Sequence, residues 1–187
     1  MKKLSFEEIN KTRCLSSEEL KKVKRNPITA VCENIRSLYN VGSIFRTVDG
    51  IRGEKLYLCG FTGRPPRKEI DRVALGSVES VPWEYERDTI KVINYLKGNG
   101  LTIIAVEHTD SSVDFQRFKY TFPLAIVLGN EIKGISDEVL SHCDYSVEIP
   151  MYGFKQSLNV ATACGVVAYE ILRQYRANHR FAPTLDR

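Results

Sequence analysis

The sequence predicts an α/β fold, in which a mostly parallel sheet carries helices on both faces. Segments with strand character alternate with segments of helical spacing along most of the chain. Several strand segments are continuous apolar runs, as expected of strands that are buried on both faces of a sheet. The chain has 187 residues, of which 43% are hydrophobic, and this is enough for one domain with a substantial core.

The chain is expected to begin with a basic extension, residues 1–26, which is followed by one domain at 27–187. Its expected elements, in order, are short polar helices within 1–25, a strand at 26–35, a helix at 40–50, a strand at 53–61 and a loop at 62–73. Asn40 is a good N-cap for the helix, which then repeats apolar residues at helical spacing. The prolines of "TGRPPRKEIDRV" predict the loop.

The second half alternates more regularly. Its expected elements are a helix at 88–100, strands at 101–109 and 123–130, a short helix at 135–142, a strand at 145–151 and a long helix at 157–180. The helix at 88–100 ends in a glycine-rich stop, and Ser136 is placed to cap the short helix. In parallel sheets ligands bind at the carboxyl ends of the strands, so the loops that follow these strands are the candidate site.

Composition excludes several classes of protein. The five cysteines are scattered without C-x-x-C spacing, and the three histidines form no metal-binding pattern, so reduced thiols in a cytoplasmic protein and no metal site are expected. The N-terminus lacks the apolar core of a secretory signal, and no apolar run is long enough to span a membrane.

The net charge of +4 is unevenly distributed. Residues 1–25 hold eight Lys and Arg against four Glu, and residues 173–187 hold four Arg against one Asp, so the ends carry +4 and +3 and the middle about −3. Basic ends suit a polyanionic partner such as RNA. Plain solvated surface charge is an equally acceptable interpretation of this pattern alone.

Common cofactor motifs are missing. The sequence has no G-x-G-x-x-G turn, no G-x-x-x-x-G-K-[ST] phosphate loop and no G-x-S-x-G elbow. The dinucleotide-binding, P-loop and hydrolase interpretations therefore lose their main support.

Three other segments carry unusual polar residues. In "NIRSLYNVGSIFRTVDG", Arg46 lies about 150° around the predicted helix from the apolar stripe. In "LAIVLGNEIKGIS", an apolar strand runs into Gly129, Glu131 and Gly134 before a new helix. In "IPMYGFKQSLNVATACG", a polar loop joins a strand to a helix rich in small residues. Each segment also has a structural interpretation: an exposed arginine, a tight glycine turn and close core packing.

Together these segments resemble the SpoU/TrmH family of SPOUT RNA 2′-O-ribose methyltransferases. The matching motifs are N-x-R-x-x-x-N-V-G-x-I-x-R-T at 34–47, L-G-N-E-x-x-G-I-S at 128–136 and I-P-M-x-G-x-x-x-S-L-N-V-A at 149–161. The resemblance covers roughly residues 27–175. It implies a deep C-terminal trefoil knot, S-adenosylmethionine as methyl donor, a homodimer, and a ribose 2′-hydroxyl of tRNA or rRNA as acceptor.

The resemblance also implies roles for individual residues. Because arginine is a poor base, we expect Arg46 instead to hold a phosphate beside the target ribose or to stabilise the developing alkoxide. Asn40 is expected to act as both cap and ligand, and Glu131 as the counter-charge that orients Arg46. Ser157 and Asn159 would close the acceptor site.

Donor binding is expected to rely on main-chain groups. The residues expected to bind the donor are Glu107, Leu128, Gly129, Gly134, Ile149, Met151, Ser157 and Leu158. The residues expected to contact RNA, all placed in loops, are Arg36, Arg64, Arg67 and Lys68, because phosphate recognition needs clustered positive charge.

Two alternatives remain open at this point. One is a SPOUT enzyme that methylates a base nitrogen, although the motif that contains Asn40 and Arg46 argues against it. The other is an RNA-binding module without catalytic activity, although Arg46, Glu131, Ser157 and Asn159 are all present.

Overall fold

A computed structural model describes residues 1–5, 7–9, 19 and 23–178. Most of the basic extension, including the predicted helix near residues 16–25 and Cys14, lies outside the described residues, as does the tail from 179. The division of the chain at residue 26 therefore stays a prediction.

Seven parallel strands form one sheet, as predicted, in the order β3-β2-β1-β6-β4-β7-β5. The strands are β1 (Asn26–Glu33), β2 (Gly53–Cys59), β3 (Trp83–Glu86), β4 (Thr102–Val106), β5 (Val113–Asp114), β6 (Leu124–Leu128) and β7 (Tyr145–Glu148). All five residues of β6 are buried, because this strand lies in the middle of the sheet with helices on both sides.

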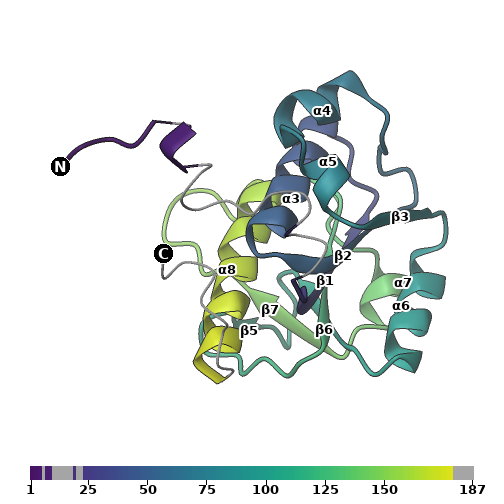
Figure 1. Ribbon diagram of the computed structural model, residues 1–187. Coiled ribbons are helices and arrows are strands. Elements are labelled where there is room, and N and C mark those ends of the chain that lie inside the picture. Colours follow the sequence, from purple (N-terminus) through teal and green to yellow (C-terminus); the bar gives the residue numbers. More distant parts are fainter. Residues whose placement is uncertain (6, 10–18, 20–22, 179–187) are drawn as a thin grey trace.

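Helices cover both faces of the sheet (Figure 1). They are α3 (Leu38–Gly50), α4 (Lys68–Ala74), α5 (Ser77–Ser80), α6 (Thr89–Gly98), α7 (Asp137–Leu140) and α8 (Val160–Asn178). The α3, α4 and α8 helices share one apolar core with alternate residues of the strands, such as Ile126. The α6 and α7 helices share the second core with the residues between them, such as Val127.

The predicted loop at 62–73 is wrong in its second half. The prolines at 65 and 66 interrupt only its first part, and α4 begins at Lys68. This helix buries Ile70 and Ala74, one turn apart, and carries Glu69 and Asp71 in its first turn. That apolar spacing and the acidic start favour a helix, but seven residues give a weak periodic signal.

Helix α3 begins earlier than predicted, and Asn40 does not cap it. Ser37 is the N-cap, and its hydroxyl accepts a hydrogen bond from the Asn40 backbone N–H at 3.4 Å.

Near the other end of the chain, α8 begins at Val160. The Asn159 side chain caps this helix, because it accepts from the N–H groups of Ala161 and Thr162.

Candidate active site

Two pockets open at the carboxyl edge of the sheet, where the sequence analysis places the site. The first lies over the ends of β6, β4 and β7, and the second near the ends of β1, β2 and β6. The turn that follows β6, residues 129–134, contributes to both. Strand ends that are distant in sequence meet here because all strands run in the same direction.

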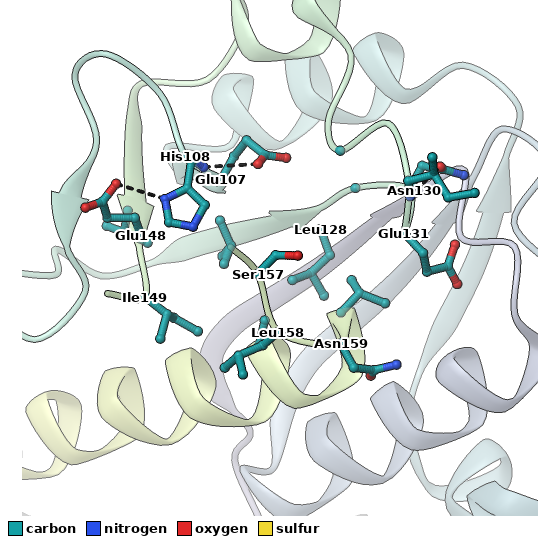
Figure 2. Close-up of a pocket in the computed structure, with 17 residues that line it drawn as sticks. Glu107, His108, Leu128, Asn130, Glu131, Glu148, Ile149, Ser157, Leu158 and Asn159 are labelled. Atoms are coloured by element: carbon teal, nitrogen blue, oxygen red, sulfur yellow. Dashed lines mark hydrogen bonds and ion pairs between the residues drawn. The ribbon is translucent and has the colours of Figure 1, made fainter. Parts of the chain in front are cut away.

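The first pocket has a volume of about 380 Å³ (Figure 2). Most of the residues predicted to bind the donor line it: Glu107, Leu128, Gly129, Gly134, Ile149, Ser157 and Leu158. Of the predicted catalytic residues, Glu131 and Asn159 also line it. Met151 is half-buried and is not one of its lining residues, so the expectation that Met151 contacts a ligand here gains no support.

The 129–134 turn is built by close backbone contacts. Asn130 and Gly134 exchange two backbone hydrogen bonds of 3.0 and 2.9 Å. A side chain at Gly129 would overlap the backbone of Gly134 and Ile135, and Gly134 has a φ of +69° beside the Glu107 carboxylate. The two glycines therefore have both steric and conformational reasons to be glycine.

Glu131 is anchored at the start of α3, and no ion pair joins it to Arg46 within the described residues of one chain, so the predicted orientation of Arg46 by Glu131 stays a prediction. Its carboxylate accepts from the backbone N–H groups of Arg36 and Ser37, each at 2.9 Å, and from the Asn40 side-chain amide at 2.8 Å. Burial raises the pKa of Glu131, but these hydrogen bonds lower it by more, so the pKa lies below its ordinary value. A carboxylate at this position also complements the positive end of the helix dipole.

Asn40 connects Glu131 to the start of α8. Its amide nitrogen donates to Glu131, and its oxygen accepts from the Asn159 side chain at 3.0 Å. Asn159 in turn caps α8. The three side chains therefore form one hydrogen-bonded chain from the 129–134 turn, across α3, to the loop before α8.

Arg46 lies on α3 but does not line either pocket described above. Its side chain is exposed, and no ion pair or hydrogen bond engages it among the residues that the structure describes. Within a single chain, Arg46 is thus separate from the site to which the sequence analysis assigns it.

Of the four predicted RNA contacts, one lines the second pocket and two lie at the start of α4. Arg36 lines that pocket, and the Arg64 guanidinium stacks on the Tyr85 ring at 3.8 Å. Arg67 precedes α4, but Lys68 is its first residue and so is not in a loop as predicted.

Sequence reasoning missed two polar clusters at strand ends. His108 Nδ1 lies 3.1 Å from Glu148, and the Ser112 hydroxyl donates to the same Glu148 oxygen at 2.6 Å. Both His108 and Glu148 line the first pocket, on the side away from Glu131 (Figure 2). These hydrogen bonds lower the pKa of Glu148.

The second cluster is Glu33, only 4% exposed, which accepts from the N–H and hydroxyl of Ser136 at 3.0 and 2.7 Å. The one available signal was their position directly after an apolar strand.

The four cysteines that the structure describes line neither of these two pockets. Burial raises the pKa values of Cys59, Cys143 and Cys164 to about 12, which keeps these thiols neutral.

Over the described ranges, no group of three or more His, Cys, Asp and Glu side chains is arranged to hold a metal ion. None of the helices described is long and apolar enough to cross a bilayer.

Comparison with solved structures defines the class of protein. The Aquifex aeolicus TrmH/SpoU tRNA modifying enzyme has a TM-score of 0.78 at 30% identity, covering 86% of this chain and 84% of that one. The SpoU methyltransferase AviRb from Streptomyces viridochromogenes, in complex with AdoMet, has a TM-score of 0.75 at 26% identity, covering 82% and 59%. The fold is that of a SPOUT methyltransferase.

Comparison of sequences defines the family. The model of the SpoU rRNA Methylase family matches residues 27–169. A tRNA (guanosine(18)-2′-O)-methyltransferase from Escherichia coli (strain K12) is 34% identical over 152 residues, which are 81% of this chain and 66% of that protein. This chain belongs to the SpoU rRNA methylase family. It spans about two thirds of the length of the E. coli relative.

Proposed function

We propose that this protein transfers a methyl group from S-adenosylmethionine to a ribose 2′-hydroxyl of tRNA or rRNA. The observation that carries the proposal is the hydrogen-bonded chain Glu131–Asn40–Asn159, which joins all three family motifs at the rim of one pocket. The E. coli relative carries the name of a tRNA ribose methyltransferase, which supports this acceptor.

The first pocket fits the methyl donor. Its volume of about 380 Å³ lies in the range of small-molecule sites. Leu128, Ile149 and Leu158 offer apolar contact for an adenine ring, and the close packing at Gly129 fixes the shape of the turn that lines the pocket. Glu107 and Glu148 present acceptors for hydroxyl or ammonium groups. The AviRb complex with AdoMet supports the same donor.

The bound donor supplies an activated methyl group on a sulfonium sulfur. The protein's residues then have two tasks: to place the acceptor hydroxyl in line with that group and to stabilise the charge that develops on its oxygen. Ser157 and Asn159, at the rim of the pocket, are positioned for the first task. Arg46 either helps with the first task by holding the phosphate beside the ribose, since its planar fork suits a phosphate better than an ammonium does, or serves the second directly by stabilising the acceptor oxygen as the hydroxyl proton passes to water.

A homodimer is part of the proposal. Arg46 is exposed and outside the pocket of its own chain, so a second copy that brings its α3 to this pocket would complete the site. The trefoil knot, the RNA-binding role of residues 1–26, and a cytoplasmic location, where tRNA and rRNA are found, also stay predictions.

The decisive experiment maps 2′-O-methyl groups in cellular RNA with and without the gene for this protein. A ribose methyl that disappears with the gene supports the proposal. Digestion of RNA methylated in vitro to nucleosides then locates the group, and a methyl on a base contradicts the proposal. Calorimetry with S-adenosylmethionine tests the non-catalytic alternative, which requires that the donor does not bind.

A further inference from the structure

The second pocket has no role in the proposed reaction so far. Its volume is about 680 Å³, and it shares Asn130, Ile132 and Gly134 with the donor pocket. Because β6 lies between β1 and β4 in the sheet, the turn after β6 separates the two pockets. A ligand in the second pocket would therefore lie beside whatever occupies the first.

We propose that the second pocket takes a nucleobase of the bound RNA, stacked on the ring of Phe61. This inference rests on the proposed function and deepens it, because it names the part of the RNA that this surface recognises. It adds a base-recognition site next to the site of methyl transfer.

Phe61 is an exposed aromatic side chain on a fixed backbone. Its relative exposure is 63%, yet its N–H donates to the Asn34 side chain at 3.1 Å. The preceding carbonyl, of Gly60, accepts from the Tyr85 hydroxyl at 2.8 Å. Because the backbone is held on both sides, the Phe61 ring loses little conformational freedom when a base binds, as a surface for base stacking requires.

The wall that faces the donor pocket is tied to the same framework. The Asn130 amide donates to the Asn34 carbonyl at 2.8 Å, and its oxygen accepts from the N–H groups of Ile132 and Lys133 at 3.0 Å. Ile132, like Phe61, is a largely exposed apolar side chain, at 75%. The two offer apolar surface to a flat ring, and every base has such a face.

The charges of the pocket indicate a nucleotide and not a purely apolar ligand. Arg36 and Lys133 are exposed lining residues, suited to phosphates at the rim. Glu33 and Asp137 also line the pocket, and these carboxylates disfavour a phosphate inside it. A neutral base inside with its phosphate at the rim satisfies both sets of charges.

The test compares two labelled probes by fluorescence anisotropy at one salt concentration: a short oligouridylate and an abasic ribose-phosphate oligomer of the same length. The wild type should bind the oligouridylate more tightly. Phe61→Ala should weaken that binding by about 5- to 100-fold and leave the abasic oligomer unaffected, because only stacking is removed. Phe61→Tyr should restore binding.

Tyr95→Ala is the matched control, since Tyr95 is also exposed, at 61%, but lies on α6 and lines neither pocket. It should bind both probes as the wild type does. The inference is wrong if Phe61→Ala binds the oligouridylate normally, if it loses both probes equally, or if the wild type does not distinguish them.

Donor calorimetry checks that each variant is folded. If Phe61→Ala does not fold, Phe61→Leu, which is apolar but has no ring, replaces it under the same criteria. The proposed function has its own test, and it is wrong if the wild type transfers no methyl group to RNA. In that case the comparison of the two probes would still decide whether this pocket binds a base.

Discussion

At the scale of single residues, the hydrogen-bond partners of Asn40 determine which way its side-chain amide is oriented. Glu131 can only accept when ionised, so the Asn40 amide nitrogen must face it, and the Asn40 oxygen must then face the Asn159 amide. Glu131 also accepts from the N–H groups of Arg36 and Ser37, directly before α3. The helix that carries Arg46 is thus fixed to the turn that forms the donor pocket.

Removal of the Arg46 guanidinium should separate donor binding from turnover. Arg46→Ala should bind S-adenosylmethionine with unchanged affinity, because the side chain does not line the donor pocket. Its methyl transfer to RNA should fall about 10²- to 10³-fold, the usual cost of removing a group that stabilises developing charge. Arg46→Lys, which keeps the charge without the planar fork, should recover only part of the rate. Normal turnover by Arg46→Ala would exclude the proposed mechanism.

The carboxylate of Glu131 should make stability depend on pH. Because its pKa in the folded state is below the ordinary value of 4.5, its contribution is present above about pH 4.5 and disappears as pH falls through the lower folded-state value. Glu131→Gln should therefore be less stable than the wild type at pH 7, by about 1 kcal/mol for hydrogen bonds that are partly exposed. Urea unfolding should show the two proteins converging as pH falls from 4.5 through the lower folded-state pKa of Glu131; a difference that does not change with pH would contradict this.

At the scale of elements, the turn between β6 and α7 owes its shape to glycine. The Gly129 position has no room for a methyl group because it meets backbone atoms of Gly134 and Ile135, which cannot rotate away. The helices around the site depend instead on caps: Ser37, Ser136 and Asn159 accept from backbone N–H groups of α3, α7 and α8.

Gly129→Ala should open this turn and abolish donor binding. The overlap with backbone should also cost about 1–3 kcal/mol of stability or more. Gly98→Ala is the control, since a methyl group there meets nothing within 4 Å and the residue ends a helix, where alanine is favoured. Calorimetry and thermal unfolding measure both effects. If Gly129→Ala still binds the donor, the turn does not form the donor-binding site.

At the scale of the whole molecule, the parallel sheet brings two pockets to one edge, with a shared turn between them. The site nevertheless lacks Arg46 in a single chain. A second copy arranged by two-fold symmetry would supply that residue to each pocket equally.

Mixing two inactive variants tests this arrangement. Arg46→Ala and Ser157→Ala are each expected to be inactive alone, and random exchange of subunits should restore about a quarter of the wild-type activity, because half of the dimers then hold one complete site. Each variant incubated alone under the same exchange conditions is the control. If mixing restores no activity while native mass spectrometry confirms mixed dimers, Arg46 acts within its own chain or not at all.

The sequence by itself determined the alternation of strands and helices, the buried β6, the cap of α7 and the edge of the sheet at which the pockets open. These features follow from local periodicity and from residues next to one another in the chain. Short elements such as β3, β5 and α4 were missed because a few residues carry too little periodic signal.

Only the tertiary structure decided which loops meet. Asn40 lies 91 positions from Glu131 and 119 from Asn159 in the sequence, so no local pattern could show that these three bond to one another. For the same reason, opposite charge alone pairs Glu131 with Arg46, whereas within one chain the fold places Glu131 against the backbone N–H groups of Arg36 and Ser37, directly before α3. Periodicity reports which face of an element is buried, but the strand order of the sheet decides which strand ends become neighbours.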